Sequence, residues 1–149
     1  MEQINFKINL NGNPCGDRWP ACRVLVNDDV KFDGEIQGKT LVEFDVDIED
    51  DSENKLVIDY YYNKDYRKDV ILVANDMPYV DKTIDIDNIL VDDIDLGQIP
   101  YNTGVVEVYE DMYPSDLPRT RKEDAVLSWN STWTMTFSSP VYIWLLESM

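Results

Sequence analysis

The apolar residues of this chain recur at every second position over most of its length, which is the period of a β-strand with one buried face. In the segment 42–48 apolar side chains alternate with carboxylates, so that one face is apolar and the other acidic (Val42, Phe44, Val46 and Ile48 against Glu43, Asp45 and Asp47). Nowhere does a stripe with helical spacing persist long enough for a helix of normal length. The pattern therefore predicts an all-β chain.

Short turn signals such as Asn27-Asp28-Asp29 separate the segments that alternate in this way. The segments expected to form strands are 6–10, 23–27, 42–48, 56–62, 70–74, 84–96, 105–109, 131–137 and 141–146. Many short strands at this spacing predict a two-sheet antiparallel β-sandwich with a jelly-roll-like arrangement. Because no linker, repeat or low-complexity segment interrupts the 149 residues, we expect a single domain over 1–149.

The charge of the chain excludes several classes of function. It has 13 Lys and Arg against 30 Asp and Glu, a formal net charge of −17, and no histidine. An acidic surface repels phosphate, so nucleic acid and anionic membranes are not expected as partners. Without histidine there is no Ser-His-Asp or Cys-His nucleophile and no His-bearing zinc site. The chain is therefore predicted not to be an enzyme, and a glycosidase with two carboxylates is the least favoured alternative.

The first residues contain neither a basic segment nor a continuous apolar one, and no stretch is apolar and long enough to span a bilayer. We therefore expect synthesis in a cytoplasm without a cleavable signal, and no membrane partner. Cys15 and Cys22 lie close together in a loop rich in Pro and Gly. Either they stay reduced, or they close a small disulfide ring if the protein ends up outside a cell.

Carboxylates cluster in two places, around the turn at 45–53 and along 85–95. Neither cluster matches the fixed ligand spacing of an EF-hand loop. Either these residues form solvated strand faces, or they supply the oxygen ligands of a calcium site, which would relieve the repulsion between neighbouring carboxylates. The candidate calcium ligands are Asp45, Asp47, Glu49, Asp50, Asp51, Asp92 and Asp93.

Three consecutive tyrosines, Tyr60, Tyr61 and Tyr62, lie in one expected strand, so Tyr61 points to the face opposite its neighbours. An exposed aromatic ring near Asn and Asp is typical of sugar binding, because the ring covers the C–H face while polar groups bind the hydroxyls. Trp19 and Tyr66 are further candidates for such a ring. The alternative is that Tyr61 packs under a loop or a partner subunit.

The stretch 110–124 is the one long irregular segment of the sequence, and loops of this length are usually functional or mobile. It carries the only dense basic cluster of the chain, Arg119, Arg121 and Lys122. We expect this cluster to dock either on the protein's own carboxylates or on an acidic partner.

The run Val141–Leu146 is apolar at every position. We expect either a central strand covered on both faces or a strand with one face covered by another molecule. Tyr142 and Trp144 are the candidate interface residues of this run, because aromatic side chains are enriched in the cores of interfaces.

The segments 23–30, 41–48, 54–63 and 87–92 resemble the β-sandwich carbohydrate-binding modules of the calcium-dependent, xylan-binding kind. The resemblance covers roughly the first two-thirds of the chain and is carried by stretches such as Arg23-Val-Leu-Val-Asn27 and Asn54-Lys-Leu-Val-Ile-Asp-Tyr60. It implies a sandwich fold, sugar-binding roles for Asp59, Tyr61 and Asn63, and a calcium-binding role for the acidic turns.

The closing part of the chain, with Trp129, Trp133, Pro140 and Trp144, looks like stand-alone virion proteins of tailed phages. This resemblance implies a non-catalytic virion protein that decorates the head or forms part of the neck or tail. Its partners would be other virion proteins or copies of itself, and it would reach the outside by lysis of the host. The alternative is a calcium-dependent carbohydrate-binding module that serves in adhesion to a polysaccharide.

Overall fold

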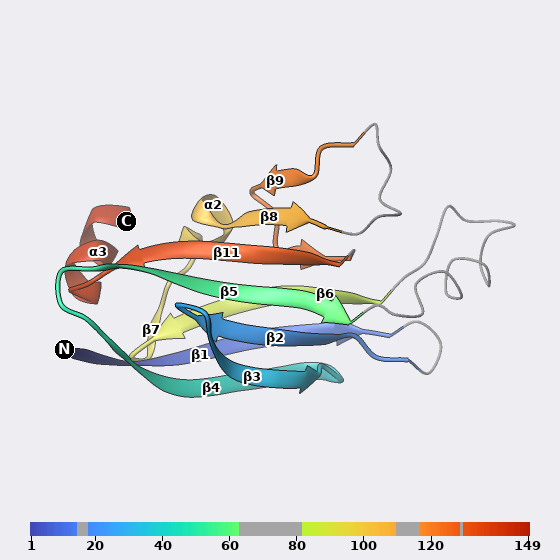
Figure 1. The fold of residues 1–149 in the computed structure, drawn as a ribbon, viewed down its shortest axis with the longest axis horizontal. Helices are drawn as coiled ribbons and strands as arrows, with labels where there is room; N and C mark the ends of the chain where they lie inside the picture. The colour runs from blue at the N-terminus through green and yellow to red at the C-terminus, as the bar shows by residue number, and fades with distance from the viewer. Residues whose placement is uncertain (15–17, 63–81, 110–116, 129) are drawn as a thin grey trace, which may run out of the picture.

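The computed structural model describes residues 1–14, 18–62, 82–109, 117–128 and 130–149, with the side chains of residues 61 and 62 excepted. Over these residues the chain is a two-layer antiparallel β-sandwich, which confirms the fold expected from the alternation (Figure 1). The two chain termini lie at the same end of the sandwich (Figure 1). Within the described ranges, no helix has the length and apolar character needed to pass through a membrane.

Each layer is one antiparallel sheet. Over the described residues, one sheet has five strands and the other has six. The five-stranded sheet runs β10 (Val126–Leu127), β6 (Thr83–Val91), β1 (Glu2–Asn13) and β4 (Gly38–Ile48), with β7 (Ile94–Asp95) paired to β6. The six-stranded sheet runs β3 (Asp29–Glu35), β2 (Ala21–Val26), β5 (Glu53–Tyr62), β11 (Ser131–Ser138), β8 (Val105–Val108) and β9 (Thr120–Lys122).

The predicted alternation builds the core between the two sheets. In β11 the side chains of Trp133, Met135 and Phe137 are buried, whereas the threonines between them lie on the outer side. Phe137 meets Phe6 of β1, from the opposite sheet, with ring centroids 5.6 Å apart. The apolar faces of both sheets therefore pack directly on each other, as the strand period requires.

The run Val141–Leu146 corrects the sequence prediction, because it is not a strand but the first part of helix α3 (Val141–Ser148). Val141 and Leu145, about one helical turn apart, are buried, whereas Leu146 is 75% exposed. A run that is apolar at every position carries neither the period of a strand nor that of a helix, so the pattern could not separate the two. The short helix α2 (Ile99–Thr103) is not predicted by the pattern either.

In two other places the structure differs in extent from the segment that the sequence predicts. The strand expected over 84–96 is divided by a turn at Asp92 and Asp93, whose φ angles are 49° and 64°. The irregular stretch expected over 110–124 includes Thr120–Lys122, which forms β9 and pairs with β8. The strand expected over 70–74 lies outside the described residues.

One irregularity in the five-stranded sheet positions the candidate site. The buried residues of β6 follow a spacing of two that is broken by one step of three (Ile84, Ile86, Ile89 and Val91). β1 pairs Asn9 with Asn88 but Leu10 with Ile86, which leaves Asp87 as an extra residue in β6. This β-bulge brings two consecutive polar residues, Asp87 and Asn88, to the outer face of the sheet.

Candidate functional site

A groove of about 510 Å³ lies over this bulge, on the outer face of the five-stranded sheet. Residues of β1, β4 and β6 line it: Asn9, Leu10, Lys39, Thr40, Leu41, Asp87 and Asn88. Leu41 is 53% exposed. The groove, which we call the bulge groove, therefore offers an apolar surface beside two amides and a carboxylate.

The two asparagines of the bulge groove hold each other across β1 and β6. Asn9 donates a hydrogen bond from Nδ2 to Oδ1 of Asn88 over 2.7 Å. Asn88 donates from its own Nδ2 to Oδ2 of Asp95 over 3.5 Å, and Oδ1 of Asp95 accepts a hydrogen bond from the backbone N–H of Gly97 over 2.8 Å. Both amides are thereby oriented by the sheet and by the turn that follows it.

A smaller hollow of about 170 Å³ adjoins the bulge groove, because Asp87 and Asn88 line both. Its far side is formed by α2 and the residue before it, through Gln98, Pro100 and Tyr101. Tyr101 is 41% exposed. An aromatic ring therefore lies along the same concave surface as the amides and the carboxylate.

This surface has the chemistry of a site for a neutral, polyhydroxylated ligand. Amide and carboxylate groups exchange hydrogen bonds with hydroxyls, and Tyr101 and Leu41 can cover C–H surface. Lys39 is the only basic residue among the described residues that line the bulge groove and the hollow. A strongly anionic ligand would find little positive charge there.

Asn9, Asn88 and Tyr101 are not predicted as site residues from the sequence, and Asp87 is predicted only as a member of the acidic segment 85–95. The sequence does indicate the bulge, because the apolar residues of β6 are separated by one step of three in a segment that otherwise alternates. For Tyr101 the sequence carries no such signal, because α2 is short and begins at a turn.

Two of the predicted sugar-binding side chains, Asp59 and Trp19, are described, and neither lines the bulge groove. Asp59 lies on the outer face of the six-stranded sheet, with Oδ2 2.9 Å from Nη2 of Arg23 and Oδ1 accepting from the hydroxyl of Tyr109 over 2.8 Å. Its two oxygens are therefore engaged by a residue of β2 and by the residue that follows β8. Trp19 is half-buried ahead of β2. The side chain of Tyr61 and the whole of Asn63 and Tyr66 lie outside the described residues.

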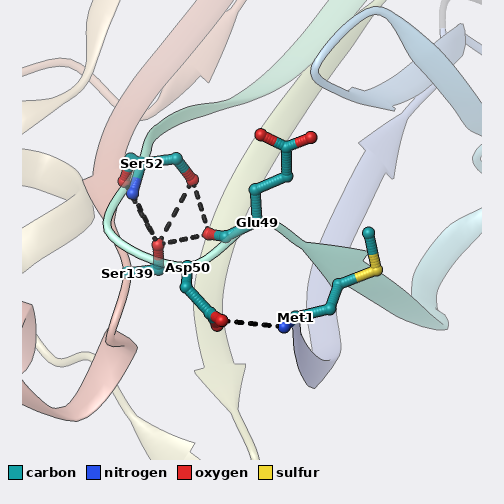
Figure 2. Close-up of polar contacts among 5 residues, drawn as sticks. All are labelled: Met1, Glu49, Asp50, Ser52 and Ser139. Atoms are coloured by element: carbon teal, nitrogen blue, oxygen red, sulfur yellow. Dashed lines mark hydrogen bonds and ion pairs between the residues drawn. The ribbon is translucent and has the colours of Figure 1, made fainter.

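The acidic residues of β4 and of the turn after it are spread over exposed surface. Asp45 accepts a hydrogen bond at Oδ1 from Nδ2 of Asn5 over 2.9 Å. Asp50 lies 2.9 Å from the N-terminal amine of Met1, and this hydrogen bond raises the pKa of the amine. Figure 2 shows the carboxylates of Glu49 and Asp50 pointing in different directions.

Ser139 holds the turn between β4 and β5 (Figure 2). Its hydroxyl donates to the backbone oxygen of Glu49 over 2.6 Å and accepts from the backbone N–H of Ser52 over 2.9 Å. The hydroxyl of Ser52 donates to the same oxygen of Glu49 over 2.7 Å. The turn is thus held together by Ser52 and Ser139, and the backbone oxygen of Glu49 already accepts from two protein hydroxyls.

Asp92 and Asp93, at the turn after β6, also bind protein donors. Asp92 accepts at Oδ1 from the backbone N–H of Asn5 over 2.8 Å and at Oδ2 from the hydroxyl of Tyr142 over 3.2 Å. Asp93 lies 2.5 Å from Nζ of Lys7.

Among the described residues, no three His, Cys, Asp or Glu side chains gather closely enough to hold a metal ion. The assignment of calcium to Asp45, Asp47, Glu49, Asp50, Asp51, Asp92 and Asp93 stays a prediction from the sequence.

The two aromatic interface candidates of α3 have different surroundings. Tyr142 is 51% exposed, and the charges of Asp92 and, less strongly, Glu2 raise the pKa of its hydroxyl. Trp144 is half-buried and packs on Phe137 with ring centroids 6.0 Å apart. Of the two, Tyr142 is therefore the side chain presented to the surface.

A third concavity, of about 530 Å³, lies between α3 and the segment from β7 to α2, and we call it the α3 groove. Most of its lining is apolar: Ile94, Leu96, Ile99, Leu145, Leu146 and Met149. Tyr142 and Asp95 are among its polar lining residues.

The basic interface candidates lie on or beside β9. Arg119 donates from Nη1 to the backbone oxygen of Val108 over 3.3 Å. Nε of Arg121 lies 3.4 Å from Oδ2 of Asp124, so this residue pairs with a carboxylate of its own segment. Lys122 is exposed at the edge of the sheet.

Cys22 is a free thiol with no exposed surface, and burial raises its pKa to about 12. Cys15 lies outside the described residues. The buried thiol has no part in the bulge groove.

The fold and the bulge groove together define a class, an antiparallel β-sandwich that presents a concave polar surface on an outer sheet face. Among solved structures, the chain is similar to the selenomethionine form of vCBM60. That structure belongs to work in which circular permutation provides an evolutionary link between two families of calcium-dependent carbohydrate binding modules. The chain is 8% identical to that structure over 89% of each chain, with a TM-score of 0.50. It is also similar to vCBM60 in complex with galactobiose, 9% identical over 90% of this chain and 97% of that one, with a TM-score of 0.42.

No family model and no curated protein matches the chain. At 8% identity, the likeness to vCBM60 is a likeness of fold. It confirms the β-sandwich fold that the sequence resemblance implies.

Proposed function

We propose that this chain is a non-catalytic carbohydrate-binding protein whose binding site is the bulge groove together with the adjoining hollow. The observation that carries the proposal is the bulge in β6. It turns Asp87 and Asn88 to the outer face where the two concavities meet. Bulges of this kind commonly re-aim side chains at functional sites.

A sugar in the bulge groove meets two kinds of surface. Asp87, Asn9 and Asn88 offer oxygen and N–H groups to ring hydroxyls, while Leu41 and Tyr101 offer apolar contact to C–H groups. Because Asn9 and Asn88 are already held by hydrogen bonds in the sheet, little side-chain entropy is lost when a ligand binds.

The groups that line the site support binding without turnover. Glycoside hydrolysis uses two carboxyl groups about 5 to 10 Å apart across the scissile bond. Among the described residues that line the bulge groove and the hollow, Asp87 is the only carboxylate. The chain also has no histidine to serve as an alternative acid or base.

The likeness of fold to vCBM60, a carbohydrate binding module, supports a binding role. The proposed site assigns no role to calcium, because Asp87 is the one carboxylate among the described residues that line it. The ligand is held by amides, one carboxylate and apolar surface.

The proposal is tested by affinity electrophoresis in gels that contain soluble xylan, galactan or hydroxyethyl cellulose, followed by calorimetry on the retarding polymer. We expect retardation by at least one polymer, and loss of it in Asn9→Ala. Asn5→Ala is the matched control, because Asn5 lies on the same face of β1 but binds Asp45, away from the bulge groove. Absence of retardation by all three, or equal loss in both variants, would contradict the proposal.

We also propose, as a second role, that the chain is a component of a phage particle, made in the host cytoplasm and released with the virion. The supporting observation is the exposed apolar surface of α3 and the chain end, where Tyr142, Ile143, Leu146 and Met149 are 51%, 53%, 75% and 89% exposed. Apolar surface of this kind commonly marks a site of protein association. Mass spectrometry of purified particles tests this role, and absence of the chain from them would contradict it.

A further inference from the structure

We infer that the α3 groove binds a second copy of this chain, through the basic segment 117–122 of that copy. The inference goes beyond carbohydrate binding and does not depend on it. The α3 groove shares no described lining residue with the bulge groove, and it shares Gly97 and Gln98 with the hollow. Leu146 lines neither the bulge groove nor the hollow, so the α3 groove can be tested there while the proposed sugar site is intact.

The α3 groove combines apolar walls with large exposed side chains. Ile94 is 42% exposed, Leu146 75% and Met149 89%, and all three line the groove. Leaving such side chains in water is unfavourable, because apolar surface is more stable when it is removed from water. Binding of an occupant that covers them would therefore be favourable.

The rim of the α3 groove is acidic. Asp95 lines it, and Asp92 accepts a hydrogen bond from the hydroxyl of Tyr142, which also lines it. No Lys or Arg is among the described residues that line the groove. The raised pKa of Tyr142, caused first by Asp92 and also by Glu2, is a further sign of negative potential at this rim. The chemistry favours an occupant with apolar and basic side chains together.

The basic segment of the same chain has this composition. Leu117 is 45% exposed, and Arg119 and Lys122 are exposed close to it. The segment ends in β9, which forms an edge of the six-stranded sheet over the described residues. It is the densest group of cations in a chain whose formal net charge is −17.

The occupant has to come from another molecule. β9 is fixed in its own chain by pairing with β8, and none of its residues lines the α3 groove. A contact between two α3 grooves is disfavoured, because it would bring two acidic rims together. Copies therefore join through unlike surfaces, which produces a reciprocal pair, a ring or an open chain according to the angle between them.

Sedimentation of the full chain at increasing concentration tests the inference. We expect wild-type protein to self-associate, and Leu146→Asp and Lys122→Glu each to weaken association by about tenfold or more. An equimolar mixture of the two variants should associate again, since each supplies the surface that the other lacks. The dependence of association on salt does not test the inference, because salt screens both the local attraction and the overall repulsion between acidic molecules.

Matched controls are available on β3, where Val30 is 52% exposed and Lys31 is exposed. Val30→Asp and Lys31→Glu carry the same changes away from both surfaces and should leave association unchanged. Thermal melting of every variant confirms that it folds. A wild-type chain that stays monomeric at millimolar concentration, controls that weaken association equally, or a mixture that does not associate would each overturn the inference.

Discussion

The ring of Trp144 packs edge-on against the ring of Phe137, with centroids 6.0 Å apart and planes at 63°. Phe137 in turn meets Phe6 from the opposite sheet. Helix α3 is thereby fixed to the core, although Ile143 and Leu146 on the same helix are exposed. One face of α3 belongs to the fold, and the other is open to association.

Trp144→Ala is expected to lower the free energy of unfolding by about 1 to 3 kcal/mol, because removing the half-buried ring leaves a void against Phe137. Ile143→Ala, at an exposed position of the same helix, should change it by less than about 0.5 kcal/mol. Urea unfolding followed by circular dichroism measures both. A Trp144→Ala variant as stable as wild type would contradict the packing role and favour the interface role predicted from the sequence.

Carbohydrate binding through the bulge groove is expected to survive a chelator. The proposed contacts use Asn9, Asn88, Asp87 and apolar surface, and none of them needs a metal ion. Calorimetry with the retarding polysaccharide, with and without EDTA, measures this. Binding that is lost in EDTA and restored by calcium but not by magnesium would contradict the bulge groove and support the calcium site predicted from the acidic segments.

The Cys22 thiol is expected to make stability fall at alkaline pH. Burial, with smaller contributions from Asp59 and Asp33, raises its pKa from 9.0 to about 12. Because the folded state then holds the proton more tightly than the unfolded state, this contribution is complete below pH 9 and is lost as the pH rises from 9 toward 12. Urea unfolding at several pH values measures the slope.

The control is Cys22→Ala, in which the alkaline fall should be shallower than in wild type. On a Cys15→Ala background, Cys22 should also resist Ellman's reagent at pH 8 until the protein is unfolded, because a buried thiol forms little thiolate. Rapid labelling of the folded protein would show that the thiol is accessible and would contradict its burial.

Periodicity predicts much of the fold because burial on one face of a strand imposes a spacing of two. The alternation of Trp133, Met135 and Phe137 with threonines gives both the strand and its buried face. The same reasoning fails for Val141–Leu146, where every position is apolar and the helix is selected by packing of Val141 and Leu145 on the sandwich.

The sequence predicts only part of the candidate site. The step of three between Ile86 and Ile89 marks a bulge, but the partner Asn9 is far away in the chain and becomes visible only through the pairing of β1 with β6. For Asp59 the resemblance implies a sugar-binding role, which stays a prediction. The contacts of its oxygens with Arg23 and Tyr109 become visible only in the structure, because periodicity does not show which side chains meet across a sheet.

Deletion of Asp87 is expected to abolish carbohydrate binding while the protein remains folded. Without the extra residue, the pairs Leu10–Ile86 and Asn9–Asn88 would follow one another in a regular ladder. The sheet should therefore keep its stability, whereas the groove and the hollow lose their carboxylate and the outward step that forms them. Thermal melting and affinity electrophoresis of the deletion variant measure the two effects separately.

Deletion of Glu43 is the matched control, because Glu43 pairs with Lys7 in a ladder that has no bulge. Removing one residue there shifts the rest of β4 by one position and turns its buried side chains to the opposite face, so this variant should unfold. If the Asp87 deletion unfolds in the same way, the extra residue is a requirement of the fold. If it folds and still binds the polysaccharide with unchanged affinity, the binding site lies elsewhere than the bulge groove.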